Sequence, residues 1–284
     1  MDKIAIFNQK GGVGKTALTA NIASALSERF NKKVLIVDSD AQCNLTNYMS
    51  ASIPDPDDES VPEKDRPEIR KSLEMFEKAP SLFDLIKKGK LFPIPITFYN
   101  GRRKVKTNVS LIRGDVDLDM LNSKDIEILR DRLLPLEDEY DYCLFDLSPQ
   151  KTTANIFSLC ATDYVLIPVN ADPDSIAGIN MVLDLCDNFH QSQKNTSIET
   201  IGILLNDIDR RESIQKYMEE NCRVNCDDLI FKSSVRHSSK ATEARLFGVP
   251  VNHKYSKTPL CFDYYEVTLE LIQTIENKKR KAGK

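Results

Sequence analysis

The sequence has no tryptophan, only three histidines and no long run of apolar residues. Its longest apolar stretches, such as Val34–Val37 and Val165–Val169, hold about five residues, whereas a membrane-spanning helix needs ~20. The N-terminus also lacks the basic end and long apolar run of a signal peptide. We therefore expect a cytoplasmic protein that does not insert into membranes. His190, His237 and His253 lie far apart in the sequence and suggest no catalytic triad.

Disulfide bonds are not expected either. The chain has seven cysteines, an odd number, and their spacing forms no disulfide framework. We interpret them as the reduced thiols of a cytosolic protein. Cys222 and Cys226 have no second cysteine pair or nearby histidine, so they do not predict a zinc site.

The length and composition are those of a globular protein. The chain has 284 residues, of which 41% are hydrophobic and 29% are charged, so it can bury a sizeable core. We predict a single domain over residues 1–284. The 39 basic and 43 acidic residues give a net charge of −4. This balance argues against a uniformly basic surface for nucleic acid, but it leaves room for a local basic patch.

Two segments differ from the rest in composition. Residues 51–80 contain nine acidic residues, five basic residues and five prolines, with few apolar residues before Ile69. We expect an exposed, partly irregular insertion there, ending in a helix. Residues 278–284 hold five basic residues in seven, and we expect this basic tail to be frayed and solvated. Contact of the tail with DNA or with anionic lipid is the lesser alternative.

Short runs rich in valine and isoleucine alternate with longer amphipathic stretches. This alternation predicts an α/β fold with a doubly wound, mostly parallel sheet flanked by helices. The predicted strands are Lys3–Phe7, Lys33–Asp38, Val109–Arg113, Tyr142–Leu147, Tyr164–Val169, Ile201–Asn206 and Leu229–Lys232. The predicted helices are Lys15–Phe30, Ser123–Leu133, Thr152–Cys160, Ser175–Phe189, Ile214–Asn221, Ser239–Phe247 and Phe262–Glu276.

Two local signals add detail between these elements. Ser81 and Asp84 have the spacing of a capping box, which predicts a short helix through Lys88. Asn100 and Gly101 lie between two β-prone runs and predict a hairpin.

A glycine-rich segment lies between the first predicted strand and the first predicted helix. Its glycines allow backbone N–H groups to turn toward a phosphate, and the N-terminus of the following helix favours an anion. In such loops the lysine reaches the β- and γ-phosphates and the next hydroxyl binds Mg²⁺, roles that fall to Lys15 and Thr16. The predicted nucleotide-binding residues are Gly11, Gly12, Val13, Gly14, Lys15, Thr16 and Ala17.

The loop has an unusual beginning. Gln9 occupies the place where such loops normally start with glycine, and a second lysine, Lys10, follows it. The run from Lys10 to Thr16 resembles the deviant Walker A loop of the ParA/MinD ATPases, a class of P-loop NTPases. The resemblance implies ATP and Mg²⁺ as cofactors and a homodimer that sandwiches two nucleotides, with Lys10 reaching into the partner's site. A cation supplied in this way would stabilise charge on the transferred phosphoryl group, so Lys10 and Lys15 are catalytic candidates.

Carboxylates follow two of the predicted strands. The segment from Asp38 to Thr46 resembles a ParA pattern, which implies that Asp38 lies near Mg²⁺ and that Asp40 orients the attacking water. Two carboxylates beside a divalent cation suit these tasks. Ala41 and Cys43 replace the proline and glycine of the family pattern, so the local turn can differ.

The resemblance continues at two later strand ends. Asp146 ends an apolar strand in the Walker B arrangement and would hold Mg²⁺ together with Thr16 and Asp38. Ser148-Pro149-Gln150 departs from the family sequence, which leaves its effect on turnover open. Asn206 resembles the strand-end asparagine that contacts adenine in this family.

The region from Arg210 to Lys257 is locally basic, with ten Lys and Arg residues against six Asp and Glu residues. ParA proteins present DNA-binding cations in this region, and such cations contact phosphates without choosing a sequence. No helix-turn-helix motif precedes the loop, and a mixed surface of salt bridges is the alternative. The candidate DNA-binding residues are Arg210, Arg211, Arg236, Lys240 and Arg245.

The resemblance covers about residues 1–50 and 105–275 and fails in the acidic insertion. It implies a partition ATPase that dimerises on ATP, binds nucleoid DNA non-specifically and hydrolyses ATP slowly when a ParB-like, centromere-binding partner stimulates it. An alternative is a ParA-like ATPase that positions a non-DNA cargo at a membrane or a cell pole. A third possibility, a metabolic P-loop enzyme, would need a second substrate pocket, for which residues 51–107 are the candidate segment.

Overall fold

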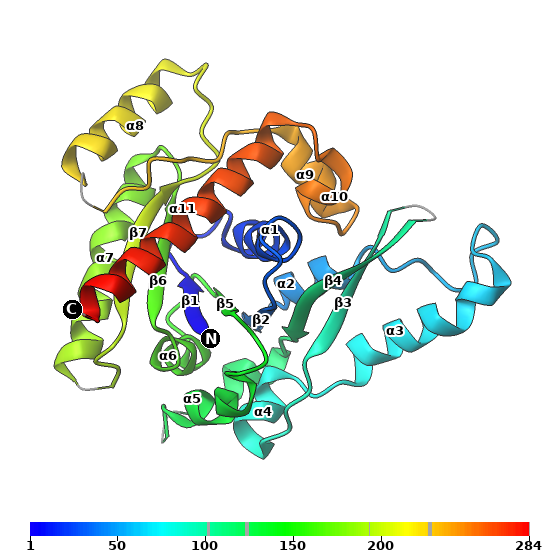
Figure 1. Ribbon diagram of the computed structural model, residues 1–284. Coiled ribbons are helices and arrows are strands. Elements are labelled where there is room, and N and C mark those ends of the chain that lie inside the picture. The colour runs from blue at the N-terminus through cyan, green and yellow to red at the C-terminus, as the bar shows by residue number, and fades with distance from the viewer. Residues whose placement is uncertain (101–102, 123–124, 193, 227–228, 284) are drawn as a thin grey trace.

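The computed structural model describes residues 1–100, 103–122, 125–192, 194–226 and 229–283. Within this part of the chain, seven strands form one sheet in the order β3-β4-β2-β5-β1-β6-β7 (Figure 1). The strands are β1 (Asp2–Ile6), β2 (Val34–Ser39), β3 (Ile94–Asn100), β4 (Arg103–Ile112), β5 (Tyr142–Leu147), β6 (Tyr164–Val169) and β7 (Glu199–Leu205).

Neighbouring strands run parallel except β3 and β4, which pair as an antiparallel hairpin at one edge. The predicted doubly wound, mostly parallel sheet is therefore confirmed. The hairpin predicted at Asn100 and Gly101 forms as well, although Gly101 itself lies outside the described residues. In the register of β2 and β5, Asp38 is the partner of Asp146, so the two carboxylates lie side by side at the same end of the sheet.

Helices cover both faces of the sheet. They are α1 (Lys15–Glu28), α2 (Asn44–Ser50), α3 (Arg66–Lys78), α4 (Leu82–Lys88), α5 (Ile128–Leu133), α6 (Thr153–Cys160), α7 (Pro173–Gln191), α8 (Ser213–Asn225), α9 (Ser239–Leu246), α10 (Val251–Tyr255) and α11 (Pro259–Ala282). Short 3₁₀ turns occur at η1 (Glu63–Asp65), η2 (Val116–Met120) and η3 (Leu134–Leu136).

The strand side chains alternate between two apolar clusters, as a sheet buried on both faces requires. One cluster joins Phe145 and its neighbours to α4, α5, α6 and α7. The other joins Leu144 and its neighbours to α1, α2 and α11. On the outer side of the β3–β4 hairpin, α3 extends outward from the body of the molecule (Figure 1). The predicted capping box at Ser81 begins α4.

Two expectations were wrong. Leu229–Lys232 forms a single parallel bridge to β7 instead of a strand, because the N–H groups of Lys232 and Ser233 donate to the Glu270 carboxylate of α11 at 2.7 and 2.8 Å. The basic tail is not frayed, because α11 continues through Ala282. There Lys279 pairs with Asp2 at 2.6 Å, and Lys278 pairs with Glu199.

Candidate active site

The glycine-rich loop has the backbone conformation that its sequence predicts. Gly12 and Gly14 have φ values of 80° and 83°, in the left-handed region that favours glycine, and α1 begins directly after Gly14. The Asn206 side chain supports the loop by donating a hydrogen bond to the Val13 carbonyl at 2.8 Å. A Cβ atom on Gly14 would lie 2.4 Å from Asn206 Nδ2, so β7 and the loop approach each other too closely for a larger residue.

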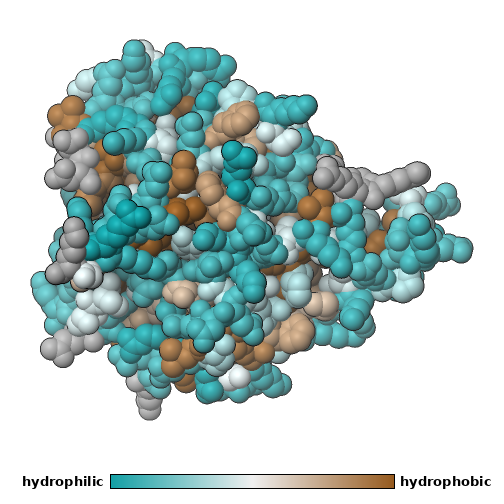
Figure 2. All heavy atoms as spheres, viewed as in Figure 1, coloured by the Kyte–Doolittle hydropathy of each residue, from teal (hydrophilic) through white to brown (hydrophobic). Residues whose placement is uncertain are grey.

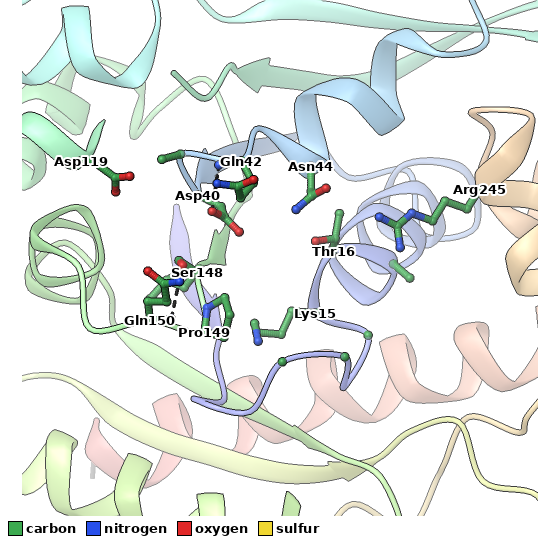
Figure 3. Close-up of a pocket in the computed structure, with 16 residues that line it drawn as sticks. Lys15, Thr16, Asp40, Gln42, Asn44, Asp119, Ser148, Pro149, Gln150 and Arg245 are labelled. Atoms are coloured by element: carbon green, nitrogen blue, oxygen red, sulfur yellow. Dashed lines mark hydrogen bonds between the residues drawn. The ribbon is translucent and has the colours of Figure 1, made fainter. Parts of the chain in front are cut away.

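A cavity of about 340 Å³ opens beside this loop (Figure 3). Eight of the predicted site residues line it: Gly11, Gly12, Gly14, Lys15, Thr16, Ala17, Asp40 and Arg245. The other predicted residues do not: Lys10, Val13, Asp38, Asp146, Asn206, Arg210, Arg211, Arg236 and Lys240. The lining consists of Gly11, Gly12, Gly14, Lys15, Thr16, Ala17, Asp40, Ala41, Gln42, Asn44, Asp119, Leu147, Ser148, Pro149, Gln150 and Arg245.

Lys15 is buried at the base of the loop. Its ammonium group donates to the carbonyls of Asn8 and Lys10, both at 2.9 Å. Burial lowers the pKa of Lys15, while the nearby carboxylates of Asp146 and Asp40 raise it in part. The loop thus holds a desolvated cation at the cavity, where an anionic ligand would be favoured over water.

Asp146 is the most unusual carboxylate of the site. Both of its oxygens are buried, and neither has a hydrogen-bond partner among the described residues. Burial and the Asp38 carboxylate raise the pKa of Asp146 to about 8, against the weaker opposing effects of Thr16 and Lys15. An unpartnered buried carboxylate beside a hydroxyl fits a divalent cation. Mg²⁺ typically takes one or two protein ligands and completes its shell with phosphates and water.

Within the described part of the chain, no three His, Cys, Asp or Glu side chains converge to hold a metal by themselves. Asp146 and Thr16 would therefore hold Mg²⁺ together with the phosphates of a nucleotide.

We expect Asp146→Asn to stabilise the protein in the absence of metal and nucleotide. The variant removes a buried carboxylate without a partner, a group that typically costs about 1–3 kcal/mol. With a folded pKa of about 8 against 3.8 for an ordinary aspartate, the folded state binds more protons between these values, so stability falls as pH rises. In urea unfolding with a chelator present, the free energy of unfolding of Asp146→Asn should exceed that of the wild type, and the difference should grow from pH 5 to pH 8. An equal or lower stability at pH 8 would contradict the assignment.

Asp38 has a different environment. Its carboxylate accepts hydrogen bonds from the Thr46 backbone and hydroxyl at 2.8 and 2.7 Å, and the Thr46 hydroxyl accepts one from the Gly114 N–H at 2.8 Å. Burial raises the pKa of Asp38 to about 6, and these hydrogen bonds oppose the change. Asp38 therefore connects β2 to α2 and to the end of β4. Its place in the Mg²⁺ shell stays a prediction.

Asp40 faces the cavity from the segment that follows β2 (Figure 3). One carboxylate oxygen accepts a hydrogen bond from the Gln42 N–H at 3.0 Å, which leaves the other directed toward the site. Ser148-Pro149-Gln150 lines the same end of the cavity, and α6 holds this segment in place. The Asn155 amide donates to the carbonyls of Ser148 and Gln150 at 2.8 and 2.7 Å.

Several lining residues were not predicted from the sequence. Asp119 reaches the cavity from η2, and Gln42 and Asn44 reach it from the start of α2 (Figure 3). The signal that could have identified Gln42 and Asn44 is their position within the Asp38–Thr46 motif. Asp119 lies in a segment with no motif, and only the fold brings it to the site.

Lys10 is turned away from its own cavity. Its ammonium group pairs with the carboxylate of Asp172, which precedes α7. Its backbone N–H donates to the Asn8 side chain at 2.9 Å, and that side chain also donates to the Pro168 carbonyl at 2.9 Å. The loop is thus connected to the end of β6 and the start of α7.

Four of the five candidate DNA-binding residues are paired within the chain. Arg210 pairs with Glu219 at 3.1 Å, Arg211 with Asp209 at 2.5 Å, Arg236 with Asp263 at 2.6 Å and Lys240 with Glu243 at 2.9 Å. The fifth, Arg245, lies at the cavity beside the loop instead of on a separate basic surface. Whether Arg245 contacts DNA stays a prediction, and the structure places its side chain at the cavity.

The helices of the described residues include none with the length and apolar character to cross a bilayer. On the face shown in Figure 2, apolar side chains form small separate patches within a largely hydrophilic surface.

Comparisons with known proteins agree with this geometry. A family model described as "AAA domain" matches residues 1–200. The chain is 28% identical to a virulence plasmid ParA family protein of Chlamydia psittaci, over 98% of this chain and 95% of the relative. It is 27% identical to the chromosome partitioning protein ParA of Myxococcus xanthus, over 99% and 92%. The structure resembles an ATP complex of a McdA variant from Cyanothece, with a TM-score of 0.72, 21% identity and 96% of both chains covered.

Proposed function

Because the chain belongs to the AAA domain family and is a ParA-like partition ATPase of the ParA/MinD superfamily, we propose that it binds ATP with Mg²⁺ and hydrolyses it slowly as a switch. The observation that carries this proposal is the cavity itself. A left-handed glycine loop and a desolvated lysine line it at the N-terminus of α1, and the unpartnered buried carboxylate of Asp146 lies near that lysine. These are the groups that phosphoryl transfer needs.

Each residue has a task in the proposed hydrolysis. The loop N–H groups and Lys15 bind the phosphate chain, and Thr16 and Asp146 hold Mg²⁺. Mg²⁺ held there would supply positive charge against the phosphates. Asp40 orients the attacking water, fixed by its hydrogen bond from the Gln42 backbone. Ser148-Pro149-Gln150, held by Asn155, forms the wall of the cavity beside Asp40 and limits the access of bulk water.

The switch acts through assembly. We propose that ATP joins two copies into a sandwich homodimer, in which Lys10 leaves Asp172 and reaches the partner's nucleotide. The dimer binds DNA non-specifically on the nucleoid, in the cytoplasm. A ParB-like, centromere-binding protein then stimulates hydrolysis and releases it, so that the bound plasmid or chromosome is segregated. The plasmid and chromosome relatives support a DNA cargo over the alternative of a protein complex positioned at a membrane or pole.

DNA binding in the presence of ATP separates these two cargoes. With Mg-ATP, the wild-type protein should bind duplexes of unrelated sequence equally, with affinity falling steeply between roughly 50 and 200 mM salt. Arg211 is the most exposed of the paired candidates, at 84% of its side-chain surface. Arg211→Ala should weaken binding uniformly and reduce the slope of log K against log salt by about 1.

Arg70→Ala is the matched control. Arg70 is also exposed and paired with an aspartate, Asp57, but it lies on α3 in the acidic insertion. It should leave the salt slope unchanged. No ATP-dependent DNA binding at either salt concentration would overturn the DNA cargo and favour the positioning of a protein complex.

A further inference from the structure

Arg245 is the one of the five candidate DNA-binding residues that lines the cavity. Its guanidinium points from α9 across the start of α1 toward Thr16 (Figure 3). Among the described residues it has no ion pair or hydrogen-bond partner, whereas Arg210, Arg211, Arg236 and Lys240 each pair with a carboxylate. An arginine without a counterion that lines an anion-binding cavity is poised to bind an anion there.

The corner between α9 and α10 fixes this position. Gly248 has a φ of 64°, and a Cβ atom there would lie 2.3 Å from the Ser52 nitrogen, so the corner packs tightly on the end of α2. The Val249 carbonyl accepts a hydrogen bond from the Tyr48 hydroxyl of α2 at 3.0 Å. The Val251 N–H donates to Asn21 of α1 at 2.8 Å. The segment that follows α9 is therefore attached to both α1 and α2, which border the cavity. These contacts hold the backbone that carries the Arg245 side chain.

The arrangement of the cavity indicates which part of a ligand Arg245 would meet. Asp40 and Asp119 lie toward one end, next to Ser148 and Gln150, and Arg245 lies at the other end, beyond Thr16 (Figure 3). In the proposed function, the carboxylate end receives the terminal phosphate and the attacking water. Arg245 therefore faces the part of the phosphate chain that is remote from the reacting bond.

We propose that Arg245 binds the nucleotide phosphate chain at its nucleoside end, the part that ATP and ADP share. This inference rests on the proposed function, since it assumes a nucleotide in the cavity. A contact of this kind strengthens the ground state and the transition state alike, so it lowers the Kd and leaves kcat nearly unchanged. It also retains ADP after hydrolysis, which slows the return of the protein to a state that can bind ATP.

Titration calorimetry with Mg-ADP and with Mg-ATP tests the inference. Arg245→Gln should raise the Kd of both nucleotides by about tenfold, the effect of losing one hydrogen bond to a charged group. Arg245→Lys should recover part of the loss, because the ammonium keeps the charge but not the planar fork. Arg130→Gln is the control, since Arg130 is a half-exposed arginine paired with Glu127 on the far side of the sheet.

The outcomes separate the inference from the proposed function. A wild-type protein that binds neither nucleotide would overturn the nucleotide site itself. A wild-type protein that binds both, with Arg245→Gln binding them equally well, would overturn only the role of Arg245. Loss of DNA affinity in ATP-saturated Arg245→Gln with an unchanged nucleotide Kd would also overturn it, in favour of the DNA contact. A loss confined to ATP would contradict a contact with the shared phosphates.

Discussion

Replacing Asp40 by alanine should lower the rate of ATP hydrolysis by about two to four orders of magnitude while Mg-ATP still binds. Asp40 is a carboxylate that faces the cavity from the segment after β2. One of its carboxylate oxygens accepts a hydrogen bond from the Gln42 N–H, so the other oxygen can accept a proton or a hydrogen bond from water. Removing it takes away an interaction made only as water attacks, so kcat falls and nucleotide affinity does not.

Single-turnover phosphate release and nucleotide titration measure the two quantities separately. Asp55→Ala is a matched control, because Asp55 accepts the same local hydrogen bond, from the Asp57 N–H at 2.9 Å, in the insertion far from the site. It should hydrolyse ATP at the wild-type rate. A fall in ATP affinity for Asp40→Ala that matches its loss of rate would show that Asp40 serves binding instead of water positioning.

Lys10→Ala should make hydrolysis independent of protein concentration and about 10³-fold slower than the stimulated wild-type rate. A cation that enters a phosphoryl-transfer site from a second subunit is worth about 10³–10⁵ in rate. In the structure Lys10 pairs with Asp172 of its own chain, so its charge is not supplied to its own cavity. We therefore expect wild-type turnover per molecule to rise with concentration as dimers form.

The matched control for Lys10→Ala is a lysine that is also paired with a carboxylate but lies outside the site. Lys78 pairs with Glu74 at 2.7 Å on α3, and Lys78→Ala should behave as the wild type does. Nucleotide affinity of the Lys10→Ala monomer should remain, because Lys15 and the loop N–H groups are untouched. A Lys10→Ala protein whose turnover still rises with concentration would refute a contribution of Lys10 across the dimer.

The loop and most strands could be predicted from the sequence because their determinants are local. The left-handed backbone requires glycine at Gly12 and Gly14, and a sheet covered on both faces requires continuous apolar runs such as Tyr142–Phe145. Asp146 could be predicted because it follows such a run. Likewise, Ser81 and Asp84 cap α4 through contacts within four residues.

What could not be predicted depends on contacts between distant segments. Arg245 belongs to a basic region by sequence, and only the packing of Gly248 on α2 brings it to the nucleotide cavity. The tail is ordered as a helix because its lysines meet acidic residues at the starts of β1 and β7, which composition alone does not reveal. Likewise, the Lys232 N–H donates to the Glu270 carboxylate, 38 residues further along the chain, instead of pairing with β7.

Light scattering on the wild-type protein is the most direct test of the central claim, that ATP controls assembly. The chain has a mass of 32.2 kDa. We expect that value without nucleotide or with Mg-ADP, and about twice that value with saturating Mg-ATP. A mass that stays at 32.2 kDa while Mg-ATP is shown to be bound would contradict the account.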